Sequence, residues 1–186
     1  MSGLLQISRF IDWVNTQVGK TVYWLVLAAV LVSAVNATVR YSLNTSSNAW
    51  LELQWYLFGA VFLLCAGYTH LHNEHIRIDV LTSGLSKRTK TWIDIIGTIF
   101  FLLPFTVLIM YLAWPLAVGS IISNEQSSNA GGLVRWPARL MVPVGFFLLV
   151  MQAFSELIKR IAYLTGDGPD PFDRKKAAYG AEPEHV

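Results

Sequence analysis

The chain has 186 residues, of which 54% are hydrophobic and only 14% are charged, and its formal net charge is +2. A soluble domain carries about 25% charged residues, so this composition argues against an ordinary soluble protein. The small net charge, without a basic stripe that carries interleaved aromatics, argues against a nucleic-acid partner. Long uncharged stretches between charged ones are typical of an integral membrane protein that crosses the lipid bilayer several times.

The first expected element is an amphipathic helix over residues 1–19. Its apolar side chains recur at i, i+3 and i+4 spacing, and they are Leu4, Ile7, Phe10, Ile11, Val14 and Val18. Arg9 and Asp12 fall outside this stripe. The pattern favours a helix that lies in the membrane interface before the first span. The alternative is that this segment simply extends the first span beyond the bilayer.

A domain of residues 20–164 is predicted to hold four transmembrane helices, at about 21–39, 51–71, 93–119 and 140–163. Each is long enough, because about 20 apolar residues of helix cross the hydrocarbon core. The third contains Pro104 and Pro115 and is expected to be tilted or kinked. Residues 165–186, with Pro, Gly and mixed charge, are predicted to form a flexible cytoplasmic tail. The predicted fold class is therefore an all-α integral membrane protein.

The basic residues predict the orientation of these spans. Four spans place both termini and the 72–92 loop on one side, with eleven of the fourteen Lys and Arg residues. The other side holds only Arg40, Arg135 and Arg139. Because basic residues favour the cytoplasmic side, we expect both termini inside. The 120–138 loop is then expected outside.

Possible metal ligands gather after the second span, where His70, His72, Glu74, His75 and Asp79 lie within ten residues. Such a set could bind a transition metal, but its spacing matches neither HExxH nor a zinc finger. A helix end at headgroup level is a simpler explanation. A haem held by two histidines would need imidazoles on facing spans, which this spacing does not provide. No metal or cofactor site is predicted, although a metal- or haem-binding redox protein remains an alternative.

Charged residues near the span ends are predicted to be structural. Glu52 opens the second span and Arg40 ends the first, so we expect an Arg40–Glu52 ion pair across the short loop. An autonomous transporter would want a carboxylate near the bilayer centre, and none is predicted there. A second alternative function, besides a redox protein, is that of an autonomous small transporter, one that works without partner subunits, and the absence of such a predicted carboxylate argues against it. Arg77 and Asp79 alternate with apolar residues and either face water at the interface or form a docking surface.

Three segments carry a resemblance to a known family. They are NAWLELQWYLFGAVFLLCAGYTH (Asn48–His70), HIRIDVL (His75–Leu81) followed by SKRTKTWID (Ser86–Asp94), and NEQSSNAGGLVRWPARLMVPVGF (Asn124–Phe146). Together with the four-span hydropathy, over roughly residues 10–164, they resemble the small membrane subunit (DctQ-type) of tripartite ATP-independent periplasmic (TRAP) transporters. The sequence looks closest to the subgroup labelled for mannitol or chloroaromatic compounds, and related systems are similar to importers of 2-oxo acids and other carboxylates.

The resemblance implies an accessory subunit that is not an enzyme, located in the bacterial inner (cytoplasmic) membrane. A periplasmic substrate-binding protein would capture the solute, and a large membrane subunit would carry it with sodium by an elevator-type motion. This chain would bind neither solute nor sodium and would enlarge the fixed scaffold. Apolar faces with small residues are expected to pack on the large subunit, and these residues are Gly59, Ala60, Ala66, Gly67 and Gly97.

Two sets of charged residues are assigned on the same basis. Glu125, Arg135 and Arg139 of the outer loop are expected to contact the binding protein, because charged rim residues steer and orient an encounter. Arg77 and Asp79 are assigned to the organisation of the cytoplasmic side.

Overall fold

The computed structural model describes residues 2–45, 47–73, 84–168 and 170. Its elements are α1 (Ser2–Leu43), α2 (Asn48–Leu64), α3 (Ala66–Leu71), α5 (Lys87–Gly97), the π-helical segment η1 (Thr98–Leu102), α6 (Leu103–Ile122) and α7 (Trp136–Thr165). Within these residues, four helical units are long and apolar enough to cross a membrane: α1, α2–α3, α5–η1–α6 and α7. The predicted all-α membrane fold with four spans is thus confirmed.

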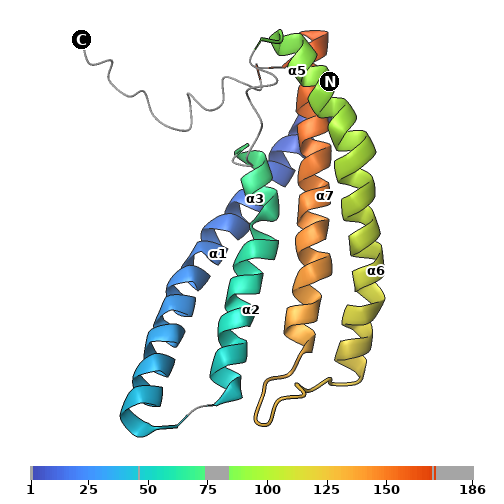
Figure 1. Cartoon of the computed structure of the whole chain (residues 1–186). Coiled ribbons are helices and arrows are strands. Elements are labelled where there is room, and N and C mark those ends of the chain that lie inside the picture. The colour runs from blue at the N-terminus through green and yellow to red at the C-terminus, as the bar shows by residue number, and fades with distance from the viewer. Residues whose placement is uncertain (1, 46, 74–83, 169, 171–186) are drawn as a thin grey trace, which may run out of the picture.

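The helices form two hairpins that pack against each other along α7 (Figure 1). The first hairpin is α1 with α2, and the second is α6 with α7. α7 lies between α2 and α6, and the N-terminal half of α1 crosses over to reach it. In the most apolar window of α7, 50% of the residues are buried, against 6% in that of α1. The core of the chain therefore lies along α7.

Local sequence explains where the helices begin and end. The Ser47 hydroxyl accepts a hydrogen bond from the Ala49 amide at 3.3 Å and caps α2. Ser86 caps α5 in the same way, through the Thr89 amide at 3.2 Å. Gly166 ends α7 in the left-handed conformation, at φ 84°, which glycine adopts without steric cost.

The segment predicted as a separate helix over residues 1–19 is continuous with the first span, because α1 runs unbroken from Ser2 to Leu43. Gly19 lies within α1 and does not interrupt it. A Cβ at this position would lie 2.5 Å from the Tyr68 ring, so the glycine allows α1 and α3 to approach closely. The polar face of this segment points inward: Ser8 and Asn15 are buried, whereas Leu4 and Phe10 are 50% and 63% exposed. Packing on α7, rather than contact with water, thus accounts for these polar residues.

The third span contains the two prolines noted in the sequence. The π-helical turn η1 ends two residues before Pro104. Proline has no N–H, and its ring crowds the carbonyl one turn earlier, so a wider turn at this point relieves the contact. Pro115 lies inside α6, which continues through it to Ile122. The span is therefore one long unit with a local change of helical register.

Two glycines allow close approach of helices to α7. A Cβ on Gly145 of α7 would lie 2.5 Å from the Leu63 carbonyl oxygen of α2. A Cβ on Gly67 of α3 would clash with the Asn15 Oδ1 of α1 and lie 3.1 Å from the Leu148 oxygen. Gly67 and Ala60, which is also buried, thus pack within the chain. Gly59 and Gly97 face open space, with nothing within 4 Å of an added Cβ.

We expect Gly145→Ala to destabilise the chain by about 1–3 kcal/mol, because the methyl group meets backbone atoms that can move only with the helix. Gly59→Ala is the matched control, since it makes the same change in a helix where no atom stands in the way. It should be neutral or stabilise by up to about 1 kcal/mol. Thermal unfolding of the purified protein in detergent measures both. Equal melting temperatures for the two variants would contradict close α2–α7 packing.

Candidate functional site

One face of α2 holds the loop that joins α6 to α7. Asn48, Glu52 and Tyr56 are spaced one helical turn apart, so they share this face. The Asn48 amide donates to the Ala130 oxygen at 2.9 Å, and the Tyr56 hydroxyl donates to the Val134 oxygen at 3.2 Å. These side chains pair with loop backbone that would otherwise lack a partner.

Glu52 accepts three hydrogen bonds from the loop, more than either of the other two residues makes with it, and it is only 4% exposed. Its Oε2 accepts a hydrogen bond from the Leu133 amide at 2.7 Å. Its Oε1 accepts one from the Asn129 side-chain amide at 2.8 Å and another from the Ser127 hydroxyl. Gly132 lies against this carboxylate, where a Cβ would be 2.8 Å from Oε1. The carboxylate near the start of α2 also suits the helix dipole.

The loop itself folds back as a short hairpin. The Ser127 amide donates to the Leu133 oxygen at 3.0 Å, and the Arg135 amide donates to the Glu125 oxygen at 2.8 Å. Gly131 takes the left-handed conformation at the tip, with φ 70°. Loop and α2 together thus form a preorganised surface.

The three residues predicted to dock a binding protein come together where this hairpin meets the start of α7. Arg139 Nη2 lies 2.7 Å from Glu125 Oε1, and Arg135 Nη1 lies 3.6 Å from the same oxygen. Arg135 also donates to the Ser128 hydroxyl at 3.1 Å. The two arginine side chains remain 40% and 41% exposed. This loop cluster, defined as Glu125, Arg135 and Arg139, therefore carries a net charge of +1 at the surface.

The structure describes only one of the other two predicted residue pairs, Arg40 with Glu52. Arg40 and Glu52 are both described, and they form no ion pair with each other, because the Glu52 carboxylate is occupied by the α6–α7 loop. The second pair, Arg77 and Asp79, lies outside the described residues. So do Glu74 and His75 of the possible metal cluster and residues 171–186 of the predicted tail. Among the described residues, no group of three or more His, Cys, Asp or Glu is arranged to hold a metal.

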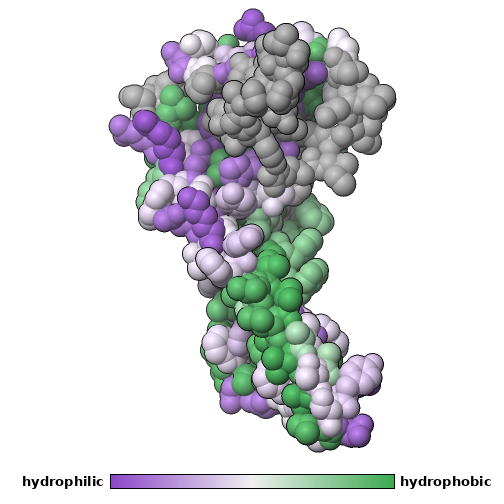
Figure 2. Space-filling model, turned by 90° about the vertical axis from the view of Figure 1, so that its left-hand side faces the viewer, coloured by the Kyte–Doolittle hydropathy of each residue, from purple (hydrophilic) through white to green (hydrophobic). Residues whose placement is uncertain are grey.

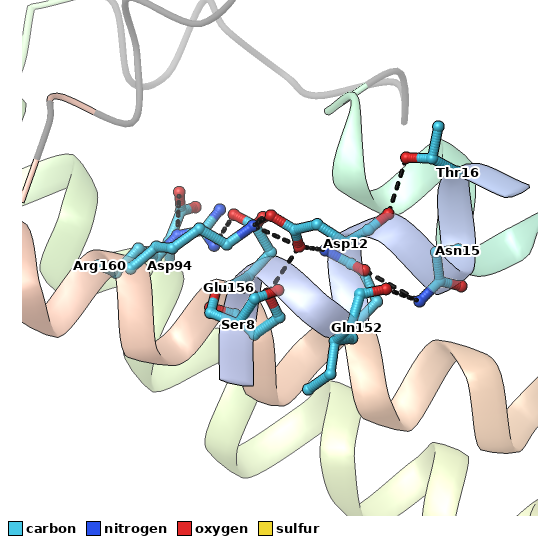
Figure 3. Close-up of polar contacts among 11 residues, drawn as sticks. Ser8, Asp12, Asn15, Thr16, Asp94, Gln152, Glu156 and Arg160 are labelled. Carbon is cyan, nitrogen blue, oxygen red and sulfur yellow. Dashed lines mark hydrogen bonds and ion pairs between the residues drawn. The ribbon is translucent and has the colours of Figure 1, made fainter. Parts of the chain in front are cut away.

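A second polar site, which the sequence did not predict, joins α1 and α5 to the C-terminal half of α7 (Figure 3). We define this interhelical network as Ser8, Asp12, Asn15, Asp94, Gln152, Ser155, Glu156, Lys159 and Arg160. Lys159 Nζ lies 2.8 Å from each carboxylate oxygen of Asp12 and also contacts Glu156. Arg160 lies 2.9 Å from Glu156 and 3.3 Å from Asp94. Charges from three helices are thus paired in one chain of contacts.

Neutral side chains complete the network on the α1 side. Ser155 and Gln152 donate to Asp12 Oδ1 at 2.7 and 2.9 Å. The Gln152 oxygen in turn accepts from Asn15 at 3.0 Å. Glu156 and Arg160 are only 1% and 2% exposed, so their charges depend on these partners rather than on water.

A recognisable signal for this network exists in the sequence. Gln152, Glu156 and Lys159 recur at i, i+4 and i+7, and on α1 Ser8, Asp12 and Asn15 do the same. Two polar stripes at helical spacing, each on an otherwise apolar helix, indicate mutual pairing.

Comparison with known proteins finds a family that matches this chain. Residues 29–162 match the family described as tripartite ATP-independent periplasmic transporters, DctQ component. No curated protein and no solved structure matches this chain. The matched segment includes all of α2, the loop cluster and most of α7, but begins after the Asp12 part of α1.

Proposed function

Because this chain belongs to the DctQ family, whose members are components of tripartite ATP-independent periplasmic transporters, we propose that it is a fixed scaffold for the large membrane subunit and a docking element for the binding protein. The chain is thus a small multi-pass membrane component of a transporter, and its family is not one of enzymes. The expected partners are a large TRAP membrane subunit and a substrate-binding protein.

The location of the buried charges supports the scaffold role. Glu52 lies at one end of the spans and Glu156 with Arg160 lies toward the other. Glu52 is bonded to the α6–α7 loop. Arg160 is bonded to Asp94 of α5, while Glu156 pairs with Arg160 within α7. These charges therefore hold helices and a loop in place rather than wait for a solute. This single observation favours a static support over an autonomous transporter, in which a charge within the membrane commonly serves the transported species.

The preorganised α6–α7 loop supports a docking role on the outer side. We place this loop in the periplasm and both termini in the cytoplasm of a bacterium, with the chain in the inner membrane. The loop cluster would then meet the binding protein, where its half-exposed arginines favour an acidic surface. The solute class we propose is organic acids such as 2-oxo acids, with sodium bound by the large subunit.

Reconstitution tests the scaffold role. Liposomes that contain this chain alone should show no uptake, whereas liposomes with both membrane subunits and the loaded binding protein should take up a 2-oxo acid when a sodium gradient is applied. Uptake by the chain alone would establish the autonomous alternative instead. A visible absorption spectrum and metal analysis of the same preparation address the redox alternative.

The docking role predicts a specific effect of Arg139→Glu. This change turns the loop cluster from a net charge of +1 to −1 and places two carboxylates together. Association of the binding protein should slow about tenfold at low salt, and less at high salt, because screening weakens steering. The measurement is binding of the binding protein to the two-subunit complex in nanodiscs at two ionic strengths. Arg40→Glu is the control; an equal effect there would assign the loss to general charge rather than to the cluster.

A further inference from the structure

The α1–α2 hairpin leaves most of its apolar surface uncovered. In the most apolar windows of α1 and α2, 6% and 11% of the residues are buried, against 50% in α7. Figure 2 views the chain from the side of α1 and shows a hydrophobic band between hydrophilic ends. A surface of this kind within a membrane contacts either lipid or another protein.

A groove of about 450 Å³ lies in this surface between the two helices. α1 contributes Val26, Ala29 and Ser33, and α2 contributes Gln54, Trp55 and Phe58. Ala29 and Ser33 are one helical turn apart, and their small side chains leave room for the backbone of another helix to approach. Trp55 and Phe58 are 65% and 72% exposed, and they project along the α2 side.

Two polar side chains in this apolar groove indicate what fills it. Within the described part of the chain, the side chains of Ser33 and Gln54 form no hydrogen bond. Thr38 of the same helix donates to the carbonyl four residues earlier, at 2.9 Å. Both groove residues lie in predicted spans. The Ser33 hydroxyl can turn to a carbonyl of its own helix, as that of Thr38 does, but the Gln54 amide has no such partner, and an unpaired amide is costly there. Acyl chains offer no hydrogen bond, whereas a helix with a polar side chain does.

We propose that the α1–α2 groove is the seat of a transmembrane helix of the large membrane subunit. The helix that fits presents a narrow face to Ala29 and Ser33, and at the same level a Ser, Thr, Asn or Gln side chain that bonds Gln54. This inference rests on the proposed function, since it needs the large subunit as a partner. It adds the surface on this chain that the partner occupies and the chemistry of the contact.

Cross-linking from single positions tests the identity of the occupant. In a Cys65→Ala background, Ser33→Cys places a thiol in the groove and Ala34→Cys places one on the adjacent exposed face. Each variant is co-expressed with the large subunit and treated with a short photoreactive thiol cross-linker. We expect an adduct with the large subunit from position 33 and at least about tenfold less from position 34, because neighbouring helical positions point about 100° apart. An adduct with a second copy, or with lipid alone, would overturn the proposal.

Packing variants test the fit independently of the cross-linker. Ser33→Phe fills the groove, whereas Ala34→Phe adds a larger side chain on the face outside it. Ser33→Phe should reduce the amount of large subunit that co-purifies about tenfold, and Ala34→Phe should leave it unchanged. Gln54→Leu keeps the bulk of the side chain and should cause a smaller loss, of about threefold.

Co-purification of the wild-type chain with the large subunit tests the proposed function separately from the assignment of the groove. If it fails to co-purify with the large subunit, the proposed function itself is wrong. If it co-purifies and Ser33→Phe does so equally well, the large subunit is bound elsewhere and only the groove assignment is wrong.

Discussion

Lys159→Met should lower the melting temperature of the purified chain by on the order of 10 °C. Lys159 Nζ is bonded to both oxygens of Asp12 and to Glu156. Without it, two carboxylates share a site in which Glu156 is 1% exposed and has lost one of its cations. Removing one partner of a buried ion pair costs about 3–5 kcal/mol, and for a chain of this size each kcal/mol corresponds to about 2–4 °C.

The matched control for this change is Lys20→Met. Lys20 is an exposed lysine of α1 and is not part of the interhelical network, so its loss should shift the melting temperature by less than about 2 °C. Both variants are followed by thermal unfolding in the same detergent. A melting temperature for Lys159→Met that equals that of Lys20→Met would show that the network does not hold α1 against α7.

A double variant separates charge from packing. Asp12→Asn in the Lys159→Met background removes the carboxylate that the lysine neutralised, while the new amide can still bond Gln152 and Ser155. Part of the lost stability should return, because the two positions are in direct contact and their effects are not additive. A double variant that is less stable than Lys159→Met alone would indicate that Asp12 acts through contacts other than this ion pair.

The spans were predictable because each requirement of a bilayer is local in sequence. A helix that crosses hydrocarbon needs about 20 consecutive apolar residues, and this can be recognised without knowing any tertiary contact. The same holds for the loop cluster, since Glu125, Arg135 and Arg139 are close in sequence and a short loop keeps them close in space.

The partners of Glu52 could not be predicted in the same way. Arg40 is the cation nearest to Glu52 in sequence, across one short loop, so the local pattern favours it as the partner. The observed partners, Ser127, Asn129 and Leu133, are 75 to 81 residues away. They depend on the α6–α7 loop meeting the start of α2, which is a consequence of α2 and α7 packing together. Nothing in the local pattern around Glu52 specifies that encounter.

The interhelical network was missed for a different reason. The sequence pattern places Asp12 on the polar face of an interfacial helix, and such a face is expected to meet water. Where such a helix continues into a membrane span, its apolar face can be the exposed one and its polar face the buried one. Here Phe10 is 63% exposed while Asn15 is buried. The spacing that gave the amphipathic pattern was right, but it does not say which face is covered.

Glu52→Gln should release the α6–α7 loop and abolish most of the transport activity of the assembled complex. The carboxylate accepts three hydrogen bonds, two on Oε1 and one on Oε2. A glutamine has one acceptor oxygen, so its amide nitrogen must face at least one of these donors. A buried donor left without an acceptor costs about 1–3 kcal/mol.

Hydrogen exchange measures the loop directly. At a cost of about 2 kcal/mol, amides of residues 123–135 should exchange about 30-fold faster, whereas those in the middle of α7 should be unchanged. Arg40→Gln is the control on the same side of the chain. If it accelerates exchange as much as Glu52→Gln does, the Arg40–Glu52 pair matters after all and the loop contacts are not what Glu52 supplies.

Transport assays then decide whether loop order matters for docking. Glu52→Gln leaves the loop cluster chemically intact, so a loss of uptake must come from where the loop is held rather than from its charge. Arg139→Glu changes the charge while Glu52 still binds the loop backbone. If docking needs a preorganised surface, uptake should fall in both variants, but only Glu52→Gln should show faster exchange across the loop. A Glu52→Gln complex with a mobile loop and normal uptake would show that docking does not require a preorganised α6–α7 loop.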